Sequence, residues 1–373
     1  MFTVRLFNLE RFMADVRSLQ RRWRLWRAGA VWGVKAFGWA VQAALETHGT
    51  DPQPEKRLSS FAYGGQAVIE GVMMRGQYVA AISVRNPKGT IVTKEIPLKA
   101  ALYRGRMAKL PFLRGLVMLW DALVLGTSAL MWSADVALEE EEDVEFSFEG
   151  AAGVGLVLVS VALMLGLFVA IPAAASHAVK DVTGLDSRLA ADVIEGVVKL
   201  GMLVGYIWLI SHMNDVKRLF GYHGAEHKTI NAYEAGAELT PENVSAYPIQ
   251  HPRCGTAFLL TVVFISVAVH ILTGRPDGVI ALVLARIGLI FPIAGISYEI
   301  IRFTSKHLDN PIVRQIVRPN LALQHLTTRQ PDLTMIEVGI ASLERVLEAE
   351  RAGVAVPQTR VTEIPAAVQP LGD

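Results

Sequence analysis

Charged residues are scarce in this sequence. Of its 373 residues, 19% are charged and 52% are hydrophobic, whereas a soluble domain usually has about 25% charged residues. The apolar residues are concentrated in long runs, which indicates a membrane protein. Because the net charge is only +1, there is no electrostatic basis for a general nucleic-acid-binding function.

Cysteine is almost absent as well. Cys254 is the single cysteine, which excludes an internal disulfide and leaves a metal ligand, a free thiol or a small buried residue. The N-terminal residues also lack a short apolar core followed by a small-residue cleavage site, so we expect no cleavable signal peptide.

Four apolar runs have the length of about 20 residues that a helix needs to cross a bilayer core. They lie at residues 152–175, 194–211, 256–272 and 279–301. We therefore predict an α-helical polytopic membrane protein of about four transmembrane helices, with its membrane domain at residues 152–303. The last run contains Arg286, which breaks the helix or faces the protein interior or the headgroups.

The loop charges predict the orientation of the spans. The side opposite the loop at residues 213–255 has few basic residues, namely Lys180, Arg188 and Arg275. By the positive-inside rule, this histidine-rich loop and both termini are expected in the cytoplasm. The basic residues on that side are Lys217, Arg218, Lys228 and Arg253 in the loop, and Arg302, Lys306, Arg314 and Arg318 after the last span.

Two further regions precede the first predicted span. Residues 1–47 mix Arg with Trp and predict an amphipathic helix that lies in the headgroup layer or packs on the protein. Residues 60–110 predict a small β-rich cytoplasmic unit, with alternating strands at 78–84 and 90–96 around the turn at 86–89.

The segments next to the membrane domain predict further helices. Residues 111–134 are nearly as apolar as the spans but contain Arg114 and Asp121, so we predict an amphipathic, interfacial helix there. After the last span, residues 304–352 predict cytoplasmic helices, and residues 353–373 predict a disordered tail.

A glycine-rich motif, GGQAVIEGVMMRG, occupies residues 64–76. Its glycines allow close backbone approach, and its polar residues Gln66, Glu70 and Arg75 interrupt an apolar string. On a strand, Gln66 and Glu70 point to the same face. These three residues are candidates for substrate contact, although a structural strand with one ion pair explains the pattern equally well.

The sequence HxxEH, at His223, Glu226 and His227, is the most informative motif. On a helix the two histidines lie one turn apart on one face, the spacing at which two imidazoles bind one metal ion. In zinc proteases with this arrangement, the glutamate between the histidines is the general base.

A second pair, His251 and Cys254, lies in the same loop. Two geometries remain open: all four residues bind zinc in a closed structural site, or three ligands leave a position for water that Glu226 deprotonates. Glu234, two turns beyond His227, is a candidate to replace a member of the second pair. Glu299 and Arg302 are candidates to line the site from the end of the last span, or form an ordinary ion pair there.

Three motifs resemble one known family. The strings at residues 64–76, 221–231 (GYHGAEHKTIN) and 251–256 (HPRCGT) are similar to those of the YqhQ family of bacterial membrane proteins, a domain of unknown function numbered 1385. The resemblance extends from about residue 60 to about residue 345. It implies a multi-pass protein of the bacterial inner membrane and a predicted metal-dependent enzyme, with no substrate named.

Two functional hypotheses follow. The first is a zinc-dependent hydrolase at the cytoplasmic membrane face, with Glu226 as the catalytic residue and zinc, or another divalent transition metal, as the cofactor. The alternative is a non-enzymatic scaffold in which a structural metal holds the loop and the basic face docks a ribosome, a translocon or anionic lipid. The lipid bilayer is a partner under both hypotheses.

Overall fold

A computed structural model describes residues 63–98, 110–138, scattered residues between 155 and 175, and residues 188–274, 276, 279–352 and 359–365. The amphipathic segment predicted at 1–47 lies outside the described residues, as does most of the span predicted at 152–175. Within that span the structure describes a π-helical turn, η2 (Gly166–Ala170).

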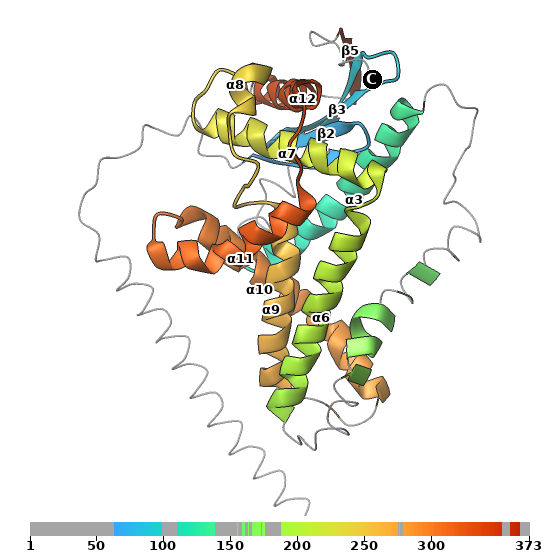
Figure 1. The fold of residues 1–373 in the computed structure, drawn as a ribbon, viewed down its shortest axis with the longest axis vertical. Coiled ribbons are helices and arrows are strands. Elements are labelled where there is room, and N and C mark those ends of the chain that lie inside the picture. Colours follow the sequence, from blue (N-terminus) through green and yellow to red (C-terminus); the bar gives the residue numbers. More distant parts are fainter. Residues whose placement is uncertain are drawn as a thin grey trace, which may run out of the picture. The chain divides into compact units, whose positions relative to one another are not determined.

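Five antiparallel strands form one sheet in the order β1-β2-β3-β4-β5 (Figure 1). The last strand comes from the C-terminal end of the chain and pairs with β4, so the disordered tail predicted at 353–373 is wrong at this strand. Its extended backbone completes the edge of the sheet. The strands are β1 (Gly64–Val68), β2 (Gly71–Arg75), β3 (Val79–Arg85), β4 (Ile91–Pro97) and β5 (Arg360–Ile364).

The hairpin predicted around residues 86–89 is confirmed by the pairing of β3 with β4. Asn86 fixes the turn, because its side-chain oxygen accepts a hydrogen bond of 2.8 Å from the Thr90 N–H. Gly89 has φ 83°, a conformation that glycine adopts without strain.

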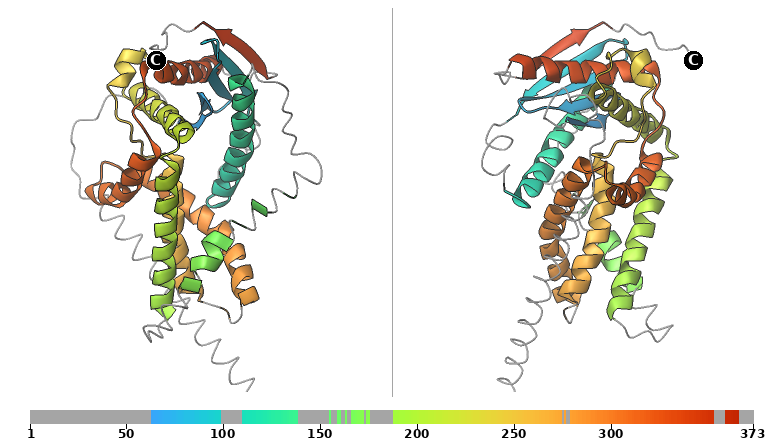
Figure 2. Two further views of the ribbon diagram at one scale, coloured as in Figure 1. Left: turned by 45° about the vertical axis from the view of Figure 1, so that its right-hand side comes forward. Right: turned by 90° about the vertical axis from the view of Figure 1, so that its left-hand side faces the viewer.

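Helices cover both faces of this sheet (Figure 2). Side chains alternate along each strand, so that Met74 packs in one core with α7 (Asn214–Glu234) and α12 (Leu333–Ala352). Its neighbour Met73 packs in a second core with α3 (Leu113–Ala137). A sheet with two covered faces explains why β3 is buried along its whole length.

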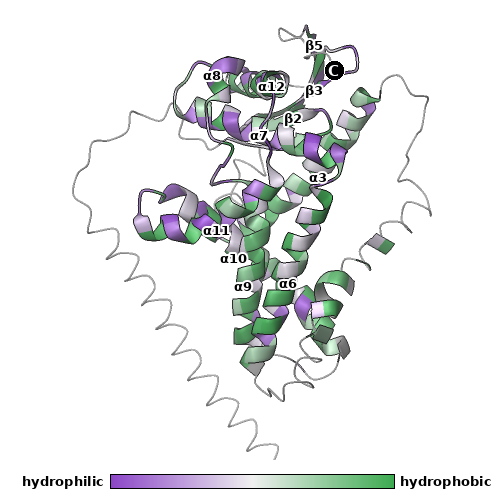
Figure 3. Cartoon of the chain, in the orientation of Figure 1, coloured by the Kyte–Doolittle hydropathy of each residue, from purple (hydrophilic) through white to green (hydrophobic). Residues whose placement is uncertain are grey.

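Three apolar helices, α6 (Arg188–Ile210), α9 (Gly255–Thr273) and α10 (Val279–Lys306), pack together. All three are long and apolar enough to cross a membrane, as is α3. Figure 3 shows the apolar character of α9 and α10 beside the more polar α7. The protein is therefore a mainly helical membrane protein with four candidate spans among the described residues, and its bundle contacts the lipid bilayer.

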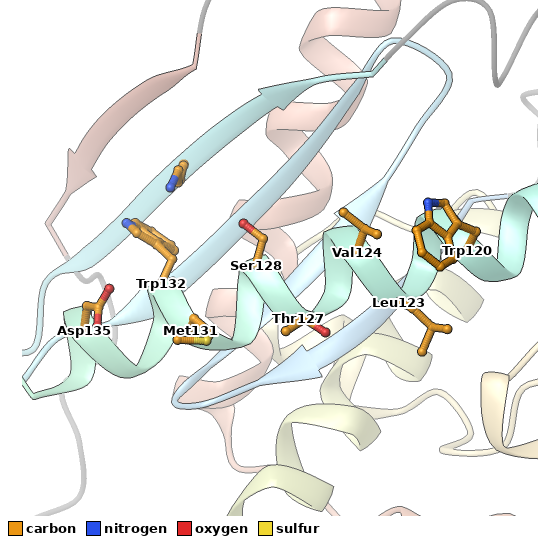
Figure 4. A pocket seen from close by; sticks show the side chains of 9 residues that line it. Trp120, Leu123, Val124, Thr127, Ser128, Met131, Trp132 and Asp135 are labelled. Carbon is orange, nitrogen blue, oxygen red and sulfur yellow. The ribbon is translucent and has the colours of Figure 1, made fainter. Parts of the chain in front are cut away.

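Helix α3 covers the segment predicted as an amphipathic, interfacial helix at 111–134, and it is also long and apolar enough for a span. Its two halves have different neighbours: Gly115 contacts Tyr298 of α10, whereas Ala129 packs against the sheet. Its outer face is exposed, with Trp120 70% accessible. This face forms an open hollow of about 710 Å³ (Figure 4), lined by Lys94, Trp120, Leu123, Val124, Thr127, Ser128, Met131, Trp132 and Asp135.

A cluster of ionisable side chains lies inside the bundle. Arg286 of α10 is buried, 3.5 Å from Asp192 and 3.3 Å from Glu195 of α6. Lys199 also pairs with Glu195, at 2.7 Å, and His270 of α9 lies 3.9 Å from the same carboxylate. Arg286 therefore faces the protein interior, one of the alternatives that the sequence leaves open, and α10 continues unbroken past it.

Candidate metal centre

Helix α7 carries His223, Glu226 and His227 on the side that packs into the protein. Glu226 and His227 are buried, while His223 is partly exposed. The centroids of the two imidazole rings are 4.4 Å apart, as expected for residues separated by one helical turn. The helix therefore presents two imidazoles and one carboxylate together.

Backbone carbonyls orient both imidazoles. His223 Nδ1 lies 2.7 Å from the Thr327 carbonyl oxygen, and His227 Nδ1 lies 2.5 Å from that of Ile249. Because a carbonyl oxygen only accepts hydrogen bonds, each Nδ1 is the donor and each Nε2 carries a lone pair. Metal-binding histidines in proteins are usually held in this way.

A close crossing brings the Thr327 carbonyl to α7. The backbone that follows α11 (Pro311–Thr327) passes over the helix at Gly224, where a Cβ atom would lie 2.1 Å from the Arg329 oxygen. The Arg329 N–H donates to the Phe220 carbonyl at 2.9 Å. The glycine between the two histidines is therefore required by this contact.

Cys254 completes the cluster from the N-terminal end of α9. Its sulfur lies 3.2 Å from His223 Nε2 and 3.0 Å from the Thr256 hydroxyl oxygen. The Thr256 N–H also donates to the sulfur, at 3.4 Å. The thiol is buried, and its position as the N-cap of α9 directs it toward the histidines.

The ligand atoms of His223, His227 and Cys254 all lie within 4.8 Å of one another. Zinc binds nitrogen at about 2.0–2.1 Å and sulfur at about 2.3 Å, so two ligands of one ion lie at most about 4.4 Å apart, and small side-chain shifts would bring any wider pair into that range. His227 Nε2 is buried and has no hydrogen-bond partner among the described residues. Leaving such a polar atom unsatisfied is costly, and a cation between the lone pairs removes this cost.

Glu226 borders the same space. One of its oxygens, Oε2, lies 3.5 Å from His227 Nε2 and 4.0 Å from His223 Nε2. Burial raises the pKa of this carboxyl, and the opposing effects of His223 and of a hydrogen bond with the Gly65 backbone are smaller. A carboxylate at these distances can be a fourth ligand or a base for a water in the fourth position.

Gly65 of β1 makes room for that carboxylate. A Cβ atom at this position would lie 2.8 Å from Glu226 Cγ and 2.5 Å from the Met73 carbonyl oxygen. The neighbouring Gly64 has open space at the same point. The glycine-rich motif therefore contributes a backbone wall behind Glu226.

His251 lies beside the cluster, not within it. Its ring centroid is 5.7 Å from that of His227, and its Nε2 is 4.0 Å from Glu234 Oε2. Burial lowers the pKa of His251 to about 4, so the imidazole is neutral at pH 7. Burial tends to raise the pKa of Glu234, but His251 and Arg253 lower it to about 2. Glu234 forms an ion pair with Arg253, so the structure brings neither Glu234 nor His251 into the three-ligand group.

The HxxEH motif and Cys254 lie within the part of the chain that matches a known family model. Residues 110–349 match the model described as a protein of unknown function, DUF1385. The chain belongs to this family. It is also 34% identical over 299 residues, 78% of this chain and 93% of the relative, to a Bacillus subtilis (strain 168) protein named "Uncharacterized protein YqhQ". No solved structure matches the chain.

The region that matches the DUF1385 family contains two contributors to the site that the sequence alone did not indicate. Gln324 of α11 is fully buried; its side-chain nitrogen donates to the His251 carbonyl at 2.8 Å, and its oxygen accepts from the His251 N–H at 2.9 Å. Thr327, one turn later, supplies the carbonyl that orients His223. The string LTTR at 326–329, part of the family resemblance, was the available signal.

The three polar residues of the glycine-rich motif are engaged elsewhere. Gln66 donates to the Gly126 carbonyl of α3 at 3.4 Å, and Arg75 pairs with Asp121 of α3 at 3.4 Å. Glu70 forms an ion pair with Arg218 and accepts a hydrogen bond from the Tyr222 hydroxyl, at 3.2 Å. The expectation that Gln66 and Glu70 share a strand face is wrong, because β1 ends at Val68 and Glu70 lies in the turn with φ 51°.

Glu299 and Arg302 lie on α10, near its end. Glu299 pairs with Arg114 of α3 and accepts a hydrogen bond of 3.1 Å from the Phe112 N–H. Glu299 therefore joins α3 to α10. In the described part of the chain, the group of three metal ligands includes neither residue.

Proposed function

We propose that this protein is a zinc-dependent hydrolase of the bacterial inner membrane, which acts at the cytoplasmic face on a substrate still to be identified. His223, His227 and Cys254 hold the metal, and Glu226 is the catalytic base. The observation that carries the proposal is the convergence of two Nε2 lone pairs and one sulfur within 4.8 Å, with a buried carboxylate beside them.

The donor set fits a catalytic zinc site. Three protein ligands leave one position for water, and catalytic zinc sites use histidine together with carboxylate or cysteine ligands. When bound, zinc supplies Lewis acidity and brings the pKa of a bound water to about 7. Glu226 accepts the water proton, and its raised pKa favours the later return of that proton to a leaving group.

The orientation follows from charge. The loop that contains the site and the segment after α10 hold most of the basic residues near the bundle, which by the positive-inside rule supports a cytoplasmic location for both. The reducing cytoplasm also keeps a lone thiol such as Cys254 available as a ligand.

Burial of the ligands favours a second candidate, a structural metal in a non-enzymatic scaffold. His227 is fully buried and Cys254 is 5% exposed. The cluster joins α7 to the start of α9, and the end of α11 contributes a carbonyl. In this case Glu226 closes the site as the fourth ligand, and the basic cytoplasmic face binds a partner.

Glu226→Gln separates the two candidates. For a hydrolase, the variant retains one zinc per protein by elemental analysis and fails to complement a deletion strain. For a scaffold with four ligands, the variant should bind less metal or reach a lower cellular level. Any loss of complementation should match that loss in size. Full complementation with full metal content refutes the catalytic role of Glu226.

The lone cysteine tests metal binding without a mutation. Because Cys254 is the single cysteine, a maleimide reports on this site alone. Zinc should slow the alkylation of the purified protein, and a chelator should restore it, while magnesium has no effect. Equal alkylation rates with and without zinc would remove Cys254 from the ligand set.

A further inference from the structure

Helix α11 starts directly after the last membrane helix. Four residues separate the end of α10 at Lys306 from Pro311, the first residue of α11. The Asn310 side chain caps the new helix by accepting a hydrogen bond from the Ile312 N–H at 2.8 Å. Figure 1 shows α11 running across the axis of the bundle at the end nearest the sheet.

The inner face of α11 packs against the bundle near one of its ends. Leu323 packs in one cluster with Leu203 and Ile207 of α6 and Leu260 of α9. Asn320 donates to the Thr261 hydroxyl at 3.2 Å. Leu260 follows the first residue of α9 by five positions, so this contact lies about 8 Å along that helix. The helix therefore lies against the flank of the bundle, just inside its end.

Helix α11 exposes apolar side chains on one side and basic side chains on the opposite side. Ile312 and Ile316, one turn apart, are 61% and 57% exposed. Arg314 and Arg318, also one turn apart, are exposed, and Arg318 donates to Gln315 at 2.8 Å. Asp309, just before the helix, is the nearby acidic residue. A helix with an apolar side and a basic side is typical of one that lies in a membrane interface.

The other end of the same helix reaches the metal centre. Gln324 holds the His251 backbone through two hydrogen bonds, and the Thr327 carbonyl orients His223. Arg318 and Thr327 are nine residues apart, about 14 Å along a helix. A displacement of α11 would therefore move the Thr327 carbonyl, which orients the proposed ligand His223.

We propose that α11 binds anionic phospholipids through its exposed residues Ile312, Arg314, Ile316 and Arg318, and that this contact holds the end of α11 in place at the metal centre. The two guanidinium groups bind the lipid phosphates, and the two isoleucines enter the acyl boundary. The coupling to the metal rests on the proposed zinc site, whereas the lipid contact does not.

Hydrogen–deuterium exchange tests the lipid contact without reference to metal. The full-length protein is placed in nanodiscs of phosphatidylcholine alone or with phosphatidylglycerol, and exchange of residues 311–327 is measured. Anionic lipid should slow the exchange, and R314Q/R318Q should abolish the difference, each arginine contributing about fivefold. R345Q/R351Q, on α12, is the control with the same charge change.

Zinc release tests the coupling. A chromogenic chelator is added to zinc-loaded protein in the same nanodiscs. Release should be slower in anionic discs, and R314Q/R318Q should accelerate it, by up to about 25-fold if the contributions of both arginines, about fivefold each, reach the metal. I312S/I316S should act in the same direction without a charge change.

Three results would overturn the proposal or one of its parts. If exchange of residues 311–327 is the same in neutral and anionic discs, the lipid contact is refuted, whatever the metal does. If exchange responds to lipid but zinc release does not, the coupling is refuted while the zinc site stands. Protein that binds no zinc at all, but whose α11 still responds to lipid, refutes the proposed function and the coupling together.

Discussion

Two buried clusters of ionisable side chains balance their charges in different ways. In the bundle, the acidic residues Asp192 and Glu195 face the basic residues Lys199 and Arg286 at 2.7–3.5 Å. In the metal centre, by contrast, two Nε2 lone pairs, a sulfur and the Glu226 carboxylate face one another.

The two clusters differ in whether they contain the partners for their own buried polar atoms. Opposite charges in the bundle neutralise each other, as is usual for ionisable residues inside a membrane protein. The centre on α7 collects acceptors, and a buried acceptor without a donor is costly. A single cation would satisfy all of them, which is why we propose a metal at this cluster and none in the bundle.

Removing one acceptor should have the largest effect. We expect His227→Ala to lose its bound zinc, because two protein ligands and a carboxylate hold the ion poorly. Elemental analysis of the purified variant measures this. His212→Ala is the matched control, because His212 is exposed at the end of the bundle. An H227A variant with the zinc content of the wild type would contradict the assignment.

Unbalancing the bundle cluster should be the next largest change. Arg286→Leu leaves two carboxylates facing one ammonium group, and breaking a buried ion pair in this way costs about 3–5 kcal/mol of the free energy of unfolding. In R286L/E195Q, Asp192 and Lys199 remain as one acid and one base, so part of the stability should return. Thermal unfolding in detergent measures both. An R286L variant as stable as the wild type would show that the cluster tolerates an unpaired charge.

A smaller change displaces the carboxylate of the metal centre. Gly65→Ala places a methyl group against Glu226 and the Met73 carbonyl, and overpacking of this kind costs about 1–3 kcal/mol. Gly64→Ala is the control one residue away, where the added methyl meets open space. Denaturant unfolding should separate the two variants. Equal stability of G64A and G65A would mean that β1 shifts freely away from α7.

Much of the fold could be predicted from periodicity. Alternating side chains and the turn around Asn86 indicated the β3–β4 hairpin, and apolar runs indicated α6, α9 and α10. Strand β5 was not predicted because its short, exposed sequence lacks an apolar face. Its partner strand also lies more than 260 residues earlier. The sequence did not decide whether α3 is a span or an interfacial helix, because this one apolar helix packs against both the bundle and the sheet.

The candidate site was predictable only where side chains form a motif. The sequence indicated His223, Glu226, His227 and Cys254 together, but it gave no basis for separating Cys254 from His251 as the third ligand. The Thr327 carbonyl and the Gln324 amide lie about 100 residues from α7 in sequence. Every residue has a carbonyl, so its role is visible only after the chain has folded.

The sheet also imposes an order on the making of the protein. Its first four strands precede every apolar helix in the described chain, while β5 and the covering helix α12 follow the last one. During synthesis, the part of the sheet that α12 covers stays exposed until all membrane helices have emerged, although α7, which packs on the same face, is made before α9 and α10. The sheet can therefore be completed only after the last membrane helix has been made. A chain arrested before that point exposes apolar residues of the sheet, which chaperones and proteases recognise.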